Sequence, residues 1–305
     1  SFPCRGRGDM FGFGAAKGTD RIAVLFHGDS SRPRKKLTPA GEALPVFHAD
    51  EPVRGEIEIR VPGGKRLDHL GVKIELVGQV EMFHDRGNFH DFTALVRELD
   101  SPGVLVGDAR FSFDFSHAEK PYESYSGLNV RLRYFVRATV TTRNYTTGNL
   151  VKEQDFVVVC QSPPPPEPSA PIKMEVGIEE CLHIEFEYDK AAYALGDIII
   201  GKVYFLLVRI KIKHMELAIV RREACSAGPQ QYNESETVTK FELMDGAPVR
   251  GECIPIRLFL SNFELTPTYR SVNNKFSVKY YLNLVLVDQE ERRYFKQQEV
   301  TFYRQ

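Results

Sequence analysis

Polar and apolar residues alternate along most of the chain from residue 21 onward. The segment 131–140, RLRYFVRATV, begins with arginines at odd positions and places bulky apolar residues between them, which is typical of a strand with one buried face. Comparable runs, separated by clusters of Gly, Pro, Asn and Asp, cover residues 21–26, 53–61, 72–83, 109–115 and 155–160. The first half is therefore predicted to be an antiparallel β-domain.

One stretch of the first half departs from this alternation. Asn88 is a residue type that caps helix N-termini, and Pro102-Gly103 is a pair that ends helices. Between them the apolar residues recur at helical spacing, at Phe89, Phe92, Leu95, Val96 and Leu99. We expect one short helix here, with its apolar stripe covering the end of a β-sandwich.

The second half repeats the first at a constant offset of 146 residues. Gly55 in VRGEI corresponds to Gly201 in IIGKV, and three further pairs keep the same offset: Phe113 with Phe259, Pro121 with Pro267, and Phe135 with Tyr281. A repeat of this length indicates duplicated sandwich domains, each with two sheets packed through their apolar faces.

A proline-rich segment, QSPPPPEPSAP at 161–171, separates the two halves. It has little apolar surface to bury and favours an extended conformation, so we interpret it as a stiff linker; a ligand for an SH3-type groove is the alternative. We predict a flexible leader over residues 1–18, an N-terminal sandwich over 19–162, the linker over 163–171 and a C-terminal sandwich over 172–305.

Composition excludes several classes of function. Forty basic and 41 acidic residues give a net charge of -1, so nucleic acid is not an expected partner. No apolar run is long enough for a membrane helix, and we expect a cytosolic protein. The five cysteines are odd in number and never spaced as C-x-x-C, so neither disulfides nor zinc is indicated.

Catalytic residue patterns are equally scarce. The closest is residues 84–91, HDRGNFHD, where His84 and His90 could hold a metal together with two aspartates, but their spacing matches no standard zinc or iron arrangement. A metal-dependent enzyme that uses these histidines remains the alternative from another functional class. We predict no enzyme, no cofactor and no metal.

The basic run 32–36, RPRKK, is expected to be solvated, with contact to an anionic membrane or a nuclear signal as alternatives.

One segment has the pattern of a binding site for another protein. Leu243 and Met244 stand immediately before Asp245-Gly246, a pair that is typical of a turn. Bulky apolar residues at such a position either enter a groove on a partner or cover their own core. The local pattern alone does not decide between these alternatives.

Six segments closely resemble the arrestin-like subunit of retromer, the vacuolar protein sorting 26 family, over about residues 45–300; these are KPYESY at 120–125, NVRLRYF at 129–135, IKMEVGIE at 172–179, FLLVRIKI at 205–212, MDGAPV at 244–249 and NLVLVD at 283–288. The resemblance implies an all-β fold of two tandem arrestin-like sandwiches. It also implies a non-catalytic adaptor in the cytoplasm, held on endosomal membranes through its partners.

The resemblance further implies what this adaptor joins. The partners are an α-solenoid scaffold subunit of the vacuolar protein sorting 35 family, sorting nexins, and cytosolic tails of transmembrane cargo in retrograde or recycling transport. The scaffold-binding loop of the family maps to Leu243, Met244, Asp245 and Gly246, and its cargo and sorting-nexin region maps to Phe295. The alternative is a free-standing arrestin-type adaptor that binds phosphorylated receptor tails.

Overall fold

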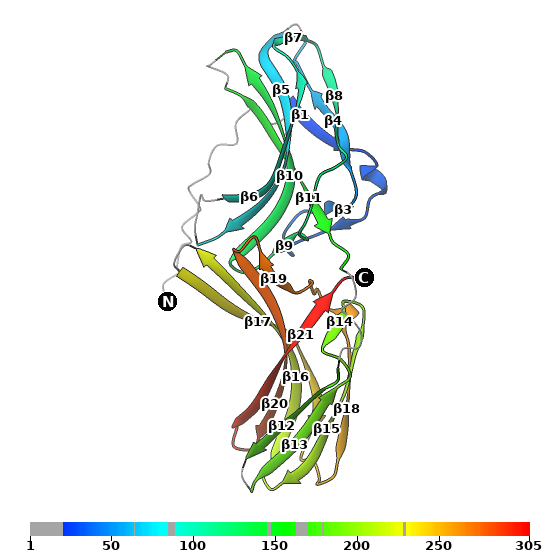
Figure 1. The fold of residues 1–305 in the computed structure, drawn as a ribbon, viewed down its shortest axis with the longest axis vertical. Helices are drawn as coiled ribbons and strands as arrows, with labels where there is room; N and C mark the ends of the chain where they lie inside the picture. The colour runs from blue at the N-terminus through cyan, green and yellow to red at the C-terminus, as the bar shows by residue number, and fades with distance from the viewer. Residues whose placement is uncertain are drawn as a thin grey trace, which may run out of the picture. The chain divides into compact units, whose positions relative to one another are not determined.

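The computed structural model describes residues 21–63, 65–84, 89–144, 148–162, 170–178, 180–227 and 230–305. The predicted leader and most of the predicted linker lie outside these ranges. The described chain is built from β-strands and two short 3-10 turns, η2 (Asp29–Ser31) and η3 (Leu260–Asn262). Figure 1 shows the strands gathered into sheets.

The chain divides into two compact units whose segments interleave along the sequence. The first unit takes the described residues up to Gln79 together with Asp91–Pro121 and Arg133–Val158. The second unit takes everything from Val159 onward, and adds Val80–His90 and Tyr122–Leu132 from the first half. The domain boundaries predicted from the sequence, which place all of residues 19–162 in one domain, stay a prediction.

Two sheets form in the first half of the chain. One has three antiparallel strands in the order β1-β4-β8, and the other has the order β2-β3-β11-β10-β5-β6, with β7 paired to β5 and β9 to β10. The bounds are β1 (Ile22–Phe26), β2 (Arg34–Lys35), β3 (Leu44–His48), β4 (Val53–Ile59), β5 (Arg66–Met82), β6 (Phe89–Asp100), β7 (Gly103–Val106), β8 (Ala109–Phe115), β9 (Tyr125–Ser126), β10 (Val130–Thr142) and β11 (Leu150–Val159).

Two further sheets form in the second half. One has the order β12-β13-β15-β18 and the other β14-β21-β20-β16-β17, with β19 paired to β20. The bounds are β12 (Ile172–Ile178), β13 (Leu182–Tyr188), β14 (Ala192–Ala194), β15 (Ile198–Val208), β16 (Ile212–Ala227), β17 (Gln230–Asp245), β18 (Cys253–Phe259), β19 (Tyr269–Val272), β20 (Phe276–Asp288) and β21 (Arg293–Tyr303). Two sandwiches of antiparallel strands, apart from the short parallel pair β14 and β21, are thus confirmed.

Alternate residues of the strands with a buried face supply the two cores. In β4 the burial alternates strictly, so that Val53, Ile57 and Ile59 are fully buried. In β13 the same alternation buries Ile184 and Phe186. The aromatic residues are used mainly for packing: in the first unit the rings of Phe26, Phe47 and Phe156 meet edge to face at 5.0–5.7 Å between centroids.

The internal repeat is visible in the paired strands β4 and β15. A side chain at Gly55 would lie 2.3 Å from the carbonyl oxygen of Leu25, and one at Gly201 would lie 2.5 Å from that of Glu187, so both positions require glycine. The anchor pair Phe113 and Phe259 is wrong, however. Gly55 pairs with Phe113 on β8, whereas Gly201 pairs with Ile256 on β18, because the chain between the paired residues is three residues shorter in the second half.

The predicted short helix is also wrong, because residues 89–100 form strand β6 at the edge of the larger sheet of the first half. Pairing with β5 supplies the backbone hydrogen bonds, and Phe92 packs edge to face on Tyr134 at 5.5 Å. An edge strand is only partly buried, so its apolar residues do not need strict alternation, and tertiary pairing overrides the helical spacing. The predicted cap, Asn88, lies outside the described residues.

Candidate partner-binding site

The predicted scaffold-binding residues lie where strand β17 ends. This strand forms a 16-residue antiparallel hairpin arm with β16, and Met244 pairs with the fully buried Met215. The next pair joins Glu242 to Glu216, so Leu243 is an extra residue in a β-bulge. The bulge interrupts the alternation of the strand, and as a result Leu243 and Met244 are consecutive, half-buried apolar residues.

The turn after this strand end is held in place by the backbone. Gly246 has a φ of 101°, a conformation that favours glycine, and its N–H donates to the carbonyl of Lys213 at 2.8 Å. Asp245 is exposed, and so are two apolar side chains of the same segment: Phe241 is 44% exposed and Val249 is 67% exposed. The segment therefore presents apolar surface from a fixed turn, as an anchor for a partner requires.

Phe295 lies on β21 of the same sheet, opposite Val285 of β20, and is 63% exposed. On its other side β21 pairs with β14 only through residues 301–303. Within the described part of the chain, no strand covers the outer edge of residues 293–300. The backbone groups along this edge are free to pair with an added strand.

The structure brings Phe295 and the β17 segment to the same end of one sheet. The register runs from Phe295 through Val285 and Glu216 to Glu242, so three inter-strand steps, about 14 Å, separate the two positions. Residues in one row of a sheet share a face, so Phe295 and Glu242 face one side. Met244 lies in the next row and faces the other side. Two partners could therefore engage the two positions without overlapping.

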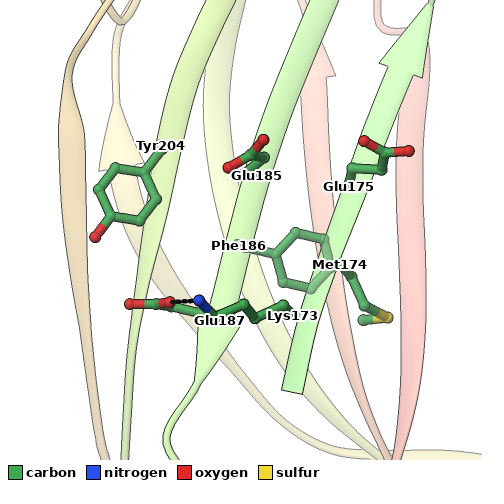
Figure 2. A pocket seen from close by; sticks show the side chains of 7 residues that line it. All are labelled: Lys173, Met174, Glu175, Glu185, Phe186, Glu187 and Tyr204. Carbon is green, nitrogen blue, oxygen red and sulfur yellow. Dashed lines mark ion pairs between the residues drawn. The ribbon is translucent and has the colours of Figure 1, made fainter. Parts of the chain in front are cut away.

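A separate hollow of about 440 Å³ lies on the other sheet of the same unit, over β12, β13 and β15 (Figure 2). Glu175, Glu185 and Glu187 line it together with Tyr204, and Lys173 pairs with Glu187 at 3.7 Å. Three carboxylates against one amine give the hollow a negative potential. It contains none of the residues that were predicted from the sequence to bind a partner.

Of the two histidines considered as metal ligands, His84 has structural contacts. One ring nitrogen of His84 lies 2.6 Å from the amide oxygen of Asn129, and its ring stacks on Tyr232 at 4.1 Å. His90 lies on the edge strand β6, while residues 85–88 lie outside the described ranges. Where the structure describes the chain, no three His, Cys, Asp or Glu side chains gather in a group that could hold a metal ion.

The basic run at residues 32–36 carries less free charge than its sequence suggests. Arg32 pairs with Glu51 at 2.6 Å, and Arg34 pairs with Asp29 at 2.7 Å. These ion pairs offset two of the four positive charges. In the described part of the chain, no helix is long and apolar enough to cross a membrane.

The sequence analysis missed two buried carboxylates of the second unit. Glu123 accepts two hydrogen bonds from Arg304, at 2.6 and 2.9 Å. Glu223 accepts from the hydroxyl of Tyr125 at 2.8 Å and from the backbone N–H of Asn129 at 2.6 Å. Glu223 lies within strand β16 but Glu123 precedes strand β9, so no sequence pattern is common to the two residues.

Comparison with known proteins places the chain in a family. Its residues 24–291 match the family model for vacuolar protein sorting-associated protein 26. It is 60% identical to vacuolar protein sorting-associated protein 26 of Dictyostelium discoideum over 264 residues, which cover 86% of the chain and 75% of the relative. It is 55% identical to protein 26B-A of Xenopus laevis and 54% identical to protein 26B of Homo sapiens, each over 97% of the chain and 87% of the relative. The chain therefore belongs to the vacuolar protein sorting-associated protein 26 family.

Proposed function

We propose that this protein is the adaptor subunit of an endosomal retromer coat and that it uses the end of β17 to bind an α-solenoid scaffold subunit. One observation carries the proposal: the bulge at Leu243 leaves two consecutive apolar side chains half-exposed at a fixed turn. A scaffold groove would remove these side chains from water, and the exposed Phe241 and Val249 would extend the contact. Family membership favours a role in protein sorting over the other uses of an apolar turn.

The open edge of β21 is the second part of this proposal. An extended cargo tail would pair with the backbone of residues 293–300, and the exposed ring of Phe295 would contact its side chains. A sorting nexin at the same end of the sheet would hold the tail in place. Through these contacts the protein would join the scaffold to transmembrane cargo in retrograde or recycling transport, and would stay cytoplasmic and peripheral to the endosomal membrane.

Titration calorimetry with the two halves of a retromer-type solenoid subunit tests the scaffold contact. We expect one half to bind, and the double variant Leu243→Asp, Met244→Asn to weaken binding at least about thirtyfold, since the loss of even one hot-spot contact of about 2 kcal/mol corresponds to that factor. Val106→Asp, at another exposed apolar residue, is the control and should bind like the parent.

Folding of the variants is checked by circular dichroism, and the milder Met244→Ser provides a second reading where the double variant melts early. Binding that survives both changes would place the interface elsewhere. A parent chain that binds neither half of the solenoid would favour the free-standing arrestin-type adaptor instead.

A further inference from the structure

A second hollow of the C-terminal half, of about 230 Å³, has a different chemistry from the acidic one. It lies where β17, β16, β20 and β19 run side by side, at residues far along the strands from Leu243 and Phe295. Arg270 and Lys275 line it with Ser226, Ser271 and Ser277, and with the amides of Gln231, Asn233 and Asn274. The lining residues, all within the described part of the chain, include no carboxylate.

Strand register explains why these side chains share one face. Ser226 pairs with Gln231, and Ala224 pairs with both Asn233 and Ser277, so these residues form adjacent rows on the same side of the sheet. The alternating residues Cys225, Phe276 and Val278 are buried on the opposite side. The carboxylates nearest in sequence also point away: Glu223 belongs to the opposite face and is bonded to Tyr125 and Asn129.

An irregularity in β19 brings the guanidinium of Arg270 to the face of the sheet that lines the hollow. Tyr269 pairs with Val278 and Val272 pairs with Phe276, so Arg270 and Ser271 together stand opposite the single residue Ser277. Such a bulge re-aims side chains that strict alternation would send to opposite faces. Both Arg270 and Ser271 line the hollow as a result.

A tight turn fixes the lysine. Asn273 and Asn274 have φ values of 47° and 53°, and the N–H of Lys275 donates to the carbonyl of Val272 at 2.8 Å, which is the geometry of a type I′ hairpin turn. The carbonyl of Lys275 in turn accepts from the N–H of Ser226 at 2.8 Å. The backbone under the lysine is therefore held from two sides.

The two cations have no counter-charge among the residues that the structure describes. Neither Arg270 nor Lys275 forms an ion pair with a described residue, in contrast to Lys279 on the same strand, which pairs with Glu299 at 3.2 Å. The lysine is half-buried and the arginine is exposed. Two positive charges, flanked by hydroxyl and amide donors, match the charge of one phosphate monoester, which is close to −2 at neutral pH.

We infer that this basic hollow, defined by Arg270, Lys275, Ser226, Ser271 and Ser277, binds the phosphate of a phosphorylated serine or threonine on a partner polypeptide. Its volume equals that of several water molecules, at about 30 Å³ each, and so admits a phosphate group. Two features favour a peptide over a membrane lipid: the lining has only two cations, and Phe276, the one large apolar residue that borders the hollow, has its side chain buried on the opposite face of the sheet. The amides of Gln231 and Asn233, on the edge strand β17, are placed to bond the peptide backbone.

Fluorescence anisotropy with a labelled peptide tests this inference. The probe is a short glycine- and alanine-rich peptide with one phosphoserine, and its unphosphorylated twin is the comparison. We expect the phosphopeptide to bind the full chain at least about tenfold more tightly, and the preference to disappear in Arg270→Ala, Lys275→Ala. The control Lys202→Ala, Arg257→Ala removes two exposed cations from the other sheet of the same unit, and should keep the preference.

Three results would overturn the inference. The first is an equal affinity of the full chain for the two peptides, or no binding of either peptide. The second is a preference that the hollow variant and the control variant lose alike, because general charge would then explain it. The third is binding of the parent only to vesicles that contain phosphatidylinositol 3-phosphate, which would assign the hollow to a lipid headgroup. Scaffold binding, measured separately, should be the same in both double variants, so failure here is distinct from failure of the proposed adaptor role.

Discussion

At the scale of single residues, the buried carboxylate Glu123 shows where sequence reasoning stops. Its side chain is 2% exposed and depends on Arg304, which lies 181 positions away. The hydrogen bonds to Glu123 raise the pKa of Arg304 above its ordinary value, so the guanidinium of Arg304 stays charged in neutral solution. Leu243 and Met244 could be singled out from the sequence because they stand directly before a turn-forming pair. The pairing of Glu123 with Arg304 leaves no such local pattern, because the two residues lie far apart in the sequence.

Removing one member of this pair should be costly. Arg304→Ala leaves the carboxylate of Glu123 buried without its counter-charge, and we expect a loss of about 3–5 kcal/mol in the free energy of unfolding. Urea denaturation followed by circular dichroism measures it. The double variant Glu123→Leu, Arg304→Leu should recover much of that loss, since no unpaired charge remains. Equal losses in the single and double variants would contradict the charge argument.

The ion pair between Glu51 and Arg32 predicts a pH dependence. Burial raises the pKa of Glu51, but hydrogen bonds from Arg32 and from the backbone of His48 outweigh it and leave the pKa below its ordinary value. A lowered pKa in the folded state contributes stability above the unfolded pKa of about 4.5, and that contribution is lost as the pH falls through the folded pKa.

Arg32→Met should therefore reduce stability at pH 7 by about 1 kcal/mol, and its difference from the parent should shrink as the pH falls below about 4. Urea titrations at several pH values measure both effects. Arg34→Met is the control, because Arg34 and Asp29 are both well exposed and their pair should contribute less. A difference between parent and Arg32→Met that stays constant with pH would rule out the titration of Glu51 as its origin.

At the scale of elements, alternation predicts a strand reliably when one face is buried and the other is solvated. The strand at 131–140 was predicted correctly for this reason, and β10 extends it to both sides. Alternation fails to predict the edge strand β6, because none of its residues is fully buried and its apolar residues happen to recur at helical spacing. It also gives no sign of the bulges in β17 and β19, because an extra residue changes the facing of a side chain without changing the composition.

The repeated glycines give a prediction about the two central strands β4 and β15. Gly55→Ala and Gly201→Ala each place a methyl group against a backbone carbonyl of the neighbouring strand, at 2.3 and 2.5 Å. Strands must move apart to admit it, and we expect each variant to lose about 1–3 kcal/mol. Thermal denaturation compares them with Gly196→Ala, where nothing lies within 4 Å of the added methyl. A control that melts as early as the other two would show that the loss comes from glycine removal in general.

The open edge of β21 predicts that Phe295 contributes to binding and not to folding. Phe295→Ala removes an exposed ring, so the free energy of unfolding should change by less than about 0.5 kcal/mol. Binding of a cargo-tail peptide in the presence of a sorting nexin should weaken about tenfold, measured by calorimetry. Phe259→Ala, at a comparably exposed ring on β18, should leave that binding unchanged. Weaker binding in both variants would remove the special role of Phe295.

At the scale of the whole molecule, the internal repeat predicts two sandwiches, but it does not predict how chain segments are shared between compact units. A proline-rich stretch looks like a boundary in the sequence because it cannot join a sheet. Contacts, however, assign Val80–His90 and Tyr122–Leu132 to the same unit as the second half. These segments bring Tyr125, whose ring stacks on Phe276 at 5.7 Å, and Asn129, whose backbone bonds Glu223.

A fragment that starts at the predicted boundary should therefore be unstable. Residues 172–305 alone lack Tyr125 and Asn129, so the side of Phe276 that Tyr125 covers becomes exposed and Glu223 loses both hydrogen-bond partners. We expect the fragment to melt at least about 10 °C below the full chain and to be cleaved faster by a protease. The missing contacts lower the free energy of unfolding by a few kcal/mol, and each kcal/mol lowers the melting temperature of a domain of this size by several degrees. A fragment that melts at the same temperature as the full chain would show that Val80–His90 and Tyr122–Leu132 add no stability to the second unit. The proline-rich stretch would then be the true domain boundary.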